Sequence, residues 1–206
     1  MTNQLTPAQA LEFLLEGNKR FTANSPTHPN QDSVRRADLA QNGQNPFATL
    51  FGCGDSRLAA EVIFDQGLGD LFVVRTAGHA SGPAVLGSLE FGVSGLNTPL
   101  VVVLGHDSCG AVTATKNSLD SGVLPGGFQR NFIEDILPSA LSSQLPDNPT
   151  VNDMVREHTR FTCERIIEQS RVISEAVAAN QTAVVGMFYH LAEGSAEIVW
   201  STDNLK

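Results

Sequence analysis

The sequence predicts an α/β fold, in which a mainly parallel β-sheet is flanked by α-helices. Two observations support this fold class. Short, unbroken apolar runs occur, of the kind that are buried on both faces of a parallel sheet. These runs alternate with longer stretches that have helical periodicity. The expected strands are residues 47–52, 71–74, 100–105 and 183–189, with residues 196–200 pairing with the last of them.

The helices are expected between these strands. Alternation of strands and helices along a chain is typical of a sheet whose faces are covered by helices. A loop at residues 144–149 separates the last two helices of the core. The expected helices are residues 59–65, 83–93, 109–119, 128–141 and 152–179.

A further helix is expected near the N-terminus. Thr6 suits the N-cap, Pro7 the first helical position, and Gln9 can complete a capping box. The residues that follow at helical spacing form a mostly apolar stripe, which packs either on its own domain or on a partner subunit. We expect a single domain, residues 1–206, in which an N-terminal helical arm (1–45) packs on a partner subunit and an α/β core (46–206) follows. The stripe consists of Leu11, Leu14, Leu15, Asn18 and Phe21.

Composition limits the possible functions. Of the 206 residues, 41% are hydrophobic and 17% are charged, which is typical of a globular protein. A net charge of −9 disfavours nucleic acid as a partner, because an acidic surface repels phosphate. Residues 1–9 contain no basic cluster followed by an apolar run, and the apolar run 100–104 is too short to span a bilayer. We therefore expect a cytoplasmic protein without a membrane partner.

Cysteine usage agrees with a reducing compartment. The chain contains three cysteines, Cys53, Cys109 and Cys163, and this small odd number does not suggest a disulfide framework. Such cysteines are buried spectators, nucleophiles or metal ligands. Cys163 lies within an expected helix among apolar residues, which predicts an inert core side chain.

Two polar segments follow directly after predicted strands. Residues 53–57 read Cys-Gly-Asp-Ser-Arg and residues 106–110 read His-Asp-Ser-Cys-Gly. Open parallel sheets bind ligands at the carboxyl ends of their strands, so both segments are expected at one edge of the sheet.

Cys53, His106 and Cys109 together form a suitable zinc ligand set. Zinc accepts sulfur and nitrogen ligands in a tetrahedron, and three protein ligands leave the fourth position open, as in a catalytic site. The alternative is that each is an ordinary buried side chain. That alternative is weakened because all three lie in glycine-flanked polar sequence at strand ends.

Asp55 and Arg57 also have two interpretations. An Asp near an Arg is usually a surface pair of little energetic value. Here the carboxylate is two residues from a candidate ligand, so it could accept a hydrogen bond from a metal-bound water or bind the metal itself. Arg57 could hold that carboxylate by a bidentate contact.

The two segments together resemble the paired signature of β-class carbonic anhydrases, Cys-x-Asp-Ser-Arg followed by His-x-x-Cys. Residues 74–78, Val-Arg-Thr-Ala-Gly, are similar to an Arg-Asn-Ala-Gly stretch of that family, with Thr76 in place of Asn. The resemblance implies one Zn²⁺ per chain, bound by Cys53, His106 and Cys109. It also implies a catalytic dyad of Asp55 and Arg57, with Asp55 a possible fourth ligand in a closed state.

The resemblance further implies the reversible, zinc-dependent hydration of carbon dioxide to bicarbonate and a proton. Carbon dioxide, bicarbonate and water would be the partners, in a pocket that lies at the interface of a homodimer or of a dimer of dimers. Gln44, Phe72 and Phe91 are the pocket residues implied by position. Leu50 stands where family members with a regulatory bicarbonate site tend to carry Trp, so no such site is expected.

Two other functions remain open. The first is a non-catalytic, zinc-stabilised regulator that binds bicarbonate. The second is a cysteine-nucleophile enzyme, such as a phosphatase or sulfurtransferase, although it would leave His106 and Cys109 without a role. The Asp55/Arg57 pair favours catalysis, because a structural zinc site needs no dyad. Of the other histidines, His79 is nearest the active segments and is a candidate proton carrier.

Overall fold

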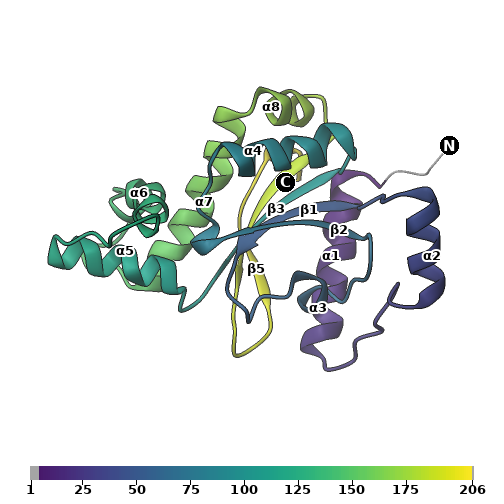
Figure 1. Cartoon of the computed structure of the whole chain (residues 1–206), viewed down its shortest axis with the longest axis horizontal. Coiled ribbons are helices and arrows are strands. Elements are labelled where there is room, and N and C mark those ends of the chain that lie inside the picture. The colour runs from purple at the N-terminus through teal and green to yellow at the C-terminus, as the bar shows by residue number, and fades with distance from the viewer. Residues whose placement is uncertain (1–4, 206) are drawn as a thin grey trace.

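The structure is a computed structural model that describes residues 5–205 (Figure 1). Its centre is a five-stranded sheet with the strand order β2-β1-β3-β4-β5. The first four strands in this order are parallel, and β5 is antiparallel to β4. This arrangement confirms the predicted fold class. The strands are β1 (Ala48–Cys53), β2 (Leu71–Thr76), β3 (Leu100–His106), β4 (Ala183–Tyr189) and β5 (Ala196–Ser201).

Alternate residues of the central strands face two separate apolar clusters. Leu50 and its register partner Val102 lie in one cluster, with Ala10 and Leu14 of α1 (Pro7–Thr22) and Ile63 of α3 (Ala60–Ile63). Because side chains alternate along a strand, both faces of β1, β3 and β4 are buried, and this explains their unbroken apolar sequences.

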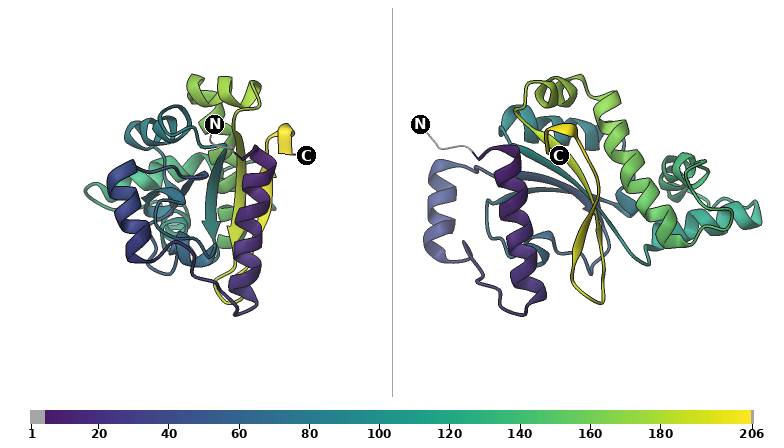
Figure 2. Two further views of the ribbon diagram at one scale, coloured as in Figure 1. Left: turned by 90° about the vertical axis from the view of Figure 1, so that its right-hand side faces the viewer. Right: turned by 180° about the vertical axis from the view of Figure 1, so that it is seen from behind.

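The second cluster lies on the opposite face of the sheet. It contains Phe51 and Val103, which are register partners, together with residues of three helices. The three helices are α4 (Pro83–Glu90), α7 (Val151–Gln169) and α8 (Arg171–Ala178). In Figure 1, α4 and α8 lie above the strands and α7 runs down beside them, and α1 lies on the other side of the sheet (Figures 1 and 2).

The first helix begins as the sequence predicts. The Thr6 side chain accepts a hydrogen bond from Gln9 N at 3.3 Å, and the Gln9 side chain accepts one from Thr6 N at 2.9 Å. Ala10 and Leu14 are fully buried against the rest of the same chain. The stripe of α1 therefore packs on its own domain, which is one of the two expected possibilities. Packing of the arm on a partner subunit stays a prediction.

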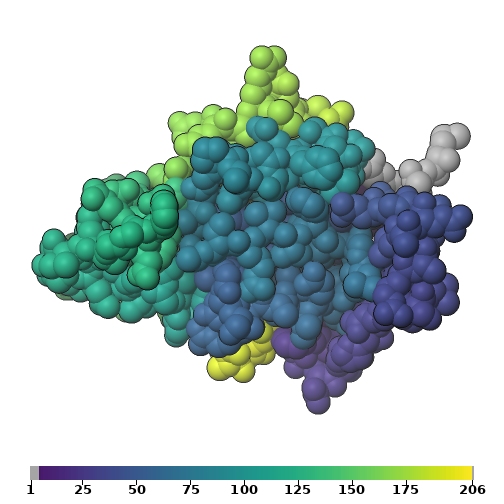
Figure 3. Space-filling view, viewed as in Figure 1, coloured from purple at the N-terminus to yellow at the C-terminus, as the bar shows by residue number. Residues whose placement is uncertain are grey.

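Two parts of the chain lie at opposite ends of the molecule. The helix α2 (Ser33–Asn42), which the sequence did not identify, lies at one end. None of its residues, all within the described range, is buried. The helices α5 (Gly110–Ser121) and α6 (Gln129–Ala140) form a lobe that projects at the other end (Figures 1 and 3).

The prediction of one helix over residues 152–179 is wrong. The helix is interrupted at Ser170, so that α7 ends and α8 begins there. The Ser170 hydroxyl accepts a hydrogen bond from Ile173 N at 3.1 Å and so caps α8. The same hydroxyl donates to Glu90 at 2.7 Å.

The expected helix 83–93 is α-helical only as far as Glu90, and α4 then continues as a π-helical turn over Phe91–Gly95. Short 3₁₀ turns occupy Ala77–His79 and Asp203–Leu205.

Across residues 5–205, no helix combines the length and the apolar character that crossing a membrane requires.

Candidate metal centre and active site

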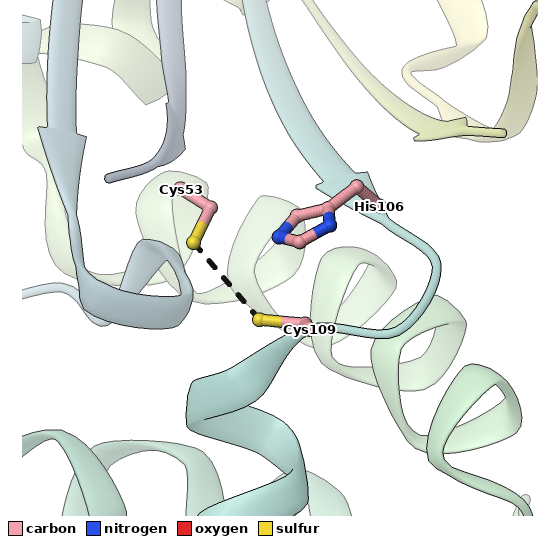
Figure 4. Close-up of side chains that lie close together, drawn as sticks. All are labelled: Cys53, His106 and Cys109. Atoms are coloured by element: carbon pink, nitrogen blue, oxygen red, sulfur yellow. Dashed lines mark hydrogen bonds between the residues drawn. The ribbon is translucent and has the colours of Figure 1, made fainter. Parts of the chain in front are cut away.

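The three predicted metal ligands lie together in the structure. Cys53 is the last residue of β1, His106 is the last residue of β3, and Cys109 lies just before α5. Since β1 and β3 are adjacent and parallel, their carboxyl ends meet. One donor atom from each residue lies within 4.8 Å of the others, and the two sulfurs are 3.9 Å apart (Figure 4).

The His106 ring is prepared to bind a cation. Its Nδ1 lies 2.8 Å from the Asp107 carbonyl oxygen. A carbonyl only accepts, so Nδ1 carries the proton and Nε2 presents a lone pair. Nε2 is buried and has no hydrogen-bond partner among residues 5–205. A buried acceptor without a partner is costly, and a metal ion would satisfy it.

The two sulfurs also suit a metal. The Cys109 thiol donates toward Cys53 and lowers the pKa of Cys53 to about 4, an effect that the N–H groups of Asp55 and Gly78 reinforce. The pKa of Cys109 is raised, because Cys109 keeps the proton that the two sulfurs share. Metal binding would displace this proton and leave two thiolates. The donor set therefore fits zinc.

Asp55 and Arg57 form a bidentate pair beside the ligands. Arg57 Nε donates to Asp55 Oδ1 at 2.9 Å and Nη2 donates to Oδ2 at 2.7 Å. These bonds lower the pKa of Asp55 well below its usual range, so the carboxylate is ionised. Asp55 Oδ2 lies 4.0 Å from His106 Nε2. The side chains of Asp55 and Arg57 are 17% and 52% exposed, so the pair borders solvent.

Arg75 also supports the site, and its role was not inferred from the sequence. Its Nε donates to the Cys53 carbonyl at 2.8 Å and its Nη2 to the Asp55 carbonyl at 2.5 Å. Arg75 lies on β2, which pairs with β1 next to Cys53. The only sequence signal for this role was the stretch 74–78, which resembled a family motif.

The predicted pocket residues do not lie at the metal ligands of the same chain. Phe72 pairs with Thr49, four positions before Cys53 on β1. Its ring contacts Phe91, with the centroids 5.9 Å apart. Gln44 is exposed in the loop between α2 and β1. A pocket formed with a partner subunit would account for this separation and stays a prediction.

The remaining candidates are buried. His79 is fully buried and its ring stacks on His158 at a centroid distance of 4.4 Å. Burial lowers the pKa of His79 well below its ordinary value, which does not suit a residue that exports protons to solvent. Cys163 is fully buried, and burial raises its pKa, as expected for an inert core cysteine.

Comparisons with known proteins agree with this site. The family model described as "Carbonic anhydrase" matches residues 48–196, which is more than half of the chain. A carbonic anhydrase of Mycolicibacterium smegmatis is 50% identical over 192 residues, covering 93% of each chain. Carbonic anhydrase 2 of Mycobacterium tuberculosis is 50% identical over 190 residues, covering 92% of this chain and 91% of that protein.

Solved structures share the fold. A tetrameric β-carbonic anhydrase of Sordaria macrospora superposes with a TM-score of 0.73 at 21% identity, covering 93% of this chain and 98% of the other. The Coccomyxa β-carbonic anhydrase in complex with acetazolamide gives a TM-score of 0.70 at 21% identity, covering 93% and 87%. The family model matches this chain, relatives are 50% identical to it, and a Cys-His-Cys cluster lies at its strand ends. The chain therefore belongs to the β-class carbonic anhydrase family.

Proposed function

We propose that this protein catalyses the zinc-dependent, reversible hydration of carbon dioxide to bicarbonate and a proton. One observation carries the proposal: three metal-binding atoms converge beside a carboxylate that an arginine keeps ionised. Two relatives with 50% sequence identity are named carbonic anhydrases, which supports the same activity.

Each site residue has a role in this proposal. Cys53, His106 and Cys109 would hold one Zn²⁺ per chain. When bound, zinc lowers the pKa of a coordinated water from about 15.7 toward 7, so that a nucleophile exists at neutral pH. Asp55, ionised and able only to accept, would hold a proton of the reacting water and orient its oxygen toward carbon dioxide.

Arg57 controls where the Asp55 carboxylate points. With both oxygens bound to Arg57, Asp55 is kept available as a hydrogen-bond acceptor. If Arg57 released it, Asp55 could become the fourth ligand, because Oδ2 is already close to the His106 ring. The two arrangements would be an open and a closed state of the same site.

We also propose that the active unit is a homodimer or a dimer of dimers. Phe72 and Phe91 contact each other away from the metal ligands of their own chain, and Phe91 is 51% exposed. This exposure suits aromatic residues that line a pocket shared with a partner subunit, as Gln44 would. Three free cysteines favour placement in the cytoplasm.

Stopped-flow measurement of carbon dioxide hydration, alongside a zinc assay, tests the proposed function. We expect the purified protein to contain about one zinc per chain and to be active. Cys109→Ala should lose metal and activity together, whereas Cys163→Ala, which removes a buried cysteine outside the site, should keep both. Zinc without hydration would instead indicate a zinc-stabilised bicarbonate-binding regulator, and protein that binds no zinc would contradict both functions.

A further inference from the structure

A chain of hydrogen bonds connects the core of the molecule to the metal-ligand sulfur of Cys53. The Ser139 hydroxyl on α6 lies 2.9 Å from His158 Nδ1 on α7. His158 Nε2 lies 3.1 Å from the Gly78 carbonyl oxygen. The N–H of the same glycine donates to Cys53 Sγ at 3.3 Å.

The direction of these bonds follows from the chemistry of their atoms. Burial lowers the pKa of His158 to about 4, so the ring is neutral near pH 7 and has one N–H. The Gly78 carbonyl can only accept, which places that proton on Nε2. Nδ1 is then the acceptor in its 2.9 Å contact with the Ser139 hydroxyl, which also donates to the Ile136 carbonyl at 2.7 Å.

The backbone around Gly78 needs such a support. Gly78 and His79 both have positive φ angles, 60° and 43°. Glycine adopts a positive φ without strain, but His79 is not glycine, and a non-glycine residue in this region persists only where the surroundings fix it. A Cβ at Gly78 would lie 2.8 Å from Ala111 Cβ and 2.9 Å from Ile136 Cδ1, so the backbone here is closely packed. This conformation aims the Gly78 N–H at the sulfur.

The His158 ring is itself held in place. Its two nitrogens are bound, and the ring of His79 stacks on it with an interplanar angle of 29°. His158 is fully buried and is 80 residues from Gly78 in the sequence. His158 binds the carbonyl of the 78–79 peptide, and this limits the rotation of Gly78, whose N–H lies in the preceding 77–78 peptide.

We propose that His158, oriented by Ser139, is a positioning residue for the metal ligand Cys53, because it keeps the Gly78 N–H bonded to the ligand sulfur. An N–H···S bond withdraws electron density from a thiolate, so its loss makes the sulfur a stronger electron donor to the metal. The inference rests on the proposed metal centre, but it does not depend on carbon dioxide as the substrate.

Cobalt substitution tests the inference without measuring turnover. Co²⁺ bound to thiolates shows a sulfur-to-metal charge-transfer band, whose energy falls when the sulfur becomes more electron-rich. In His158→Leu we expect this band to move to longer wavelength. We also expect zinc to bind about 10-fold more weakly, because the Cys53 sulfur loses a contact that orients it, and this outweighs its stronger donation. His158→Gln, which keeps a hydrogen-bond donor, should return the band most of the way to its wild-type position. Ser139→Ala should give a smaller shift in the same direction.

Cys163→Ala is the matched control, because Cys163 is equally buried on the same helix. It should lower the unfolding temperature and leave the band in place. If His158→Leu does not fold, Ser139→Ala carries the test. Unshifted bands in the folded His158 and Ser139 variants would overturn the inference while leaving the metal centre intact. A wild-type protein that takes up no cobalt would remove the metal centre, and the inference with it.

Discussion

At the residue scale, we expect Asp55 to decide whether the proposed metal centre is catalytic. Its charge is kept by three hydrogen bonds from Arg57, two from the side chain and one from the backbone N–H, and the structure places it beside the ligands without making it one of them. Asp55→Asn keeps the size of the side chain but removes the negative charge. We expect zinc content to stay unchanged and hydration activity to fall by about 10²- to 10⁴-fold, the range for loss of a positioned proton acceptor. Zinc assay and stopped-flow kinetics measure the two effects, and near-normal turnover would exclude the proposed role.

The residues of the site differ in how visible they are from sequence. Cys53, Asp55 and Arg57 lie within five consecutive positions, so their local spacing was enough to predict them together. Arg75 and His158 reach the site only through strand register and through a contact 80 residues away. Apart from the resemblance of residues 74–78 to a family motif, no local pattern marks these two residues, because their roles depend on which elements become neighbours.

At the element scale, Gly17 in α1 reverses the usual helix preference. Ala is favoured over Gly within a helix by roughly 1 kcal/mol. However, a Cβ at Gly17 would meet the Phe64 carbonyl oxygen, so α1 would have to move away from the segment after α3. We expect Gly17→Ala to lower the free energy of unfolding by about 2 kcal/mol, within the range for overpacked cores. Urea denaturation followed by circular dichroism would measure this change.

Gly87 provides the control for this prediction. It lies within α4, and a Cβ there would meet no described heavy atom within 4 Å. Gly87→Ala should therefore follow helix propensity and stabilise the protein by about 0.5–1 kcal/mol. Opposite signs for the two substitutions support the packing argument. A stabilising Gly17→Ala would mean that α1 does not contact Phe64 as described.

Element boundaries were predictable where local chemistry sets them. The start of α1 follows from Thr6 and Gln9, and the structure has that capping box. The helix α2 lacks an apolar stripe and buries no residue, so periodicity could not reveal it. Ser170 caps α8 locally and also donates a hydrogen bond to Glu90, 80 residues earlier, and this distant contact could not be read from the sequence, in which residues 152–179 read as one helix.

At the scale of the whole molecule, strand order creates the site. The sequence predicted two polar segments at strand ends, but not that β1 and β3 are neighbours at the centre of the sheet. That adjacency brings Cys53 and His106 together. The shared pocket could not be derived in the same way, because Gln44, Phe72 and Phe91 are separated from the ligands within one chain.

The whole molecule also depends on how the N-terminal segment is attached to the core. Asp65, whose side chain is 1% exposed, accepts hydrogen bonds from the backbone N–H groups of Thr27 and His28 and from Arg20. Burial alone would raise the pKa of Asp65. The Thr27 and His28 amides and Arg20 outweigh burial, so the pKa of Asp65 is lowered. Ionised Asp65 therefore stabilises the folded state more than the unfolded state.

The pH dependence follows from the sign of this shift. The stabilisation is fully present above the unfolded pKa of about 3.9 and is lost as pH falls through the lower folded value. We expect Asp65→Asn to reduce the free energy of unfolding by roughly 3 kcal/mol at pH 7, since it leaves buried donors without their charged partner. The difference from wild type should shrink as the pH is lowered below about 4. Asp120→Asn should change stability by less than about 0.5 kcal/mol, because the Asp120 side chain is 62% exposed and forms a surface ion pair with Lys116. Urea unfolding at a series of pH values measures all three proteins, and a pH-independent gap between wild type and Asp65→Asn would show that the ionised carboxylate does not anchor this segment.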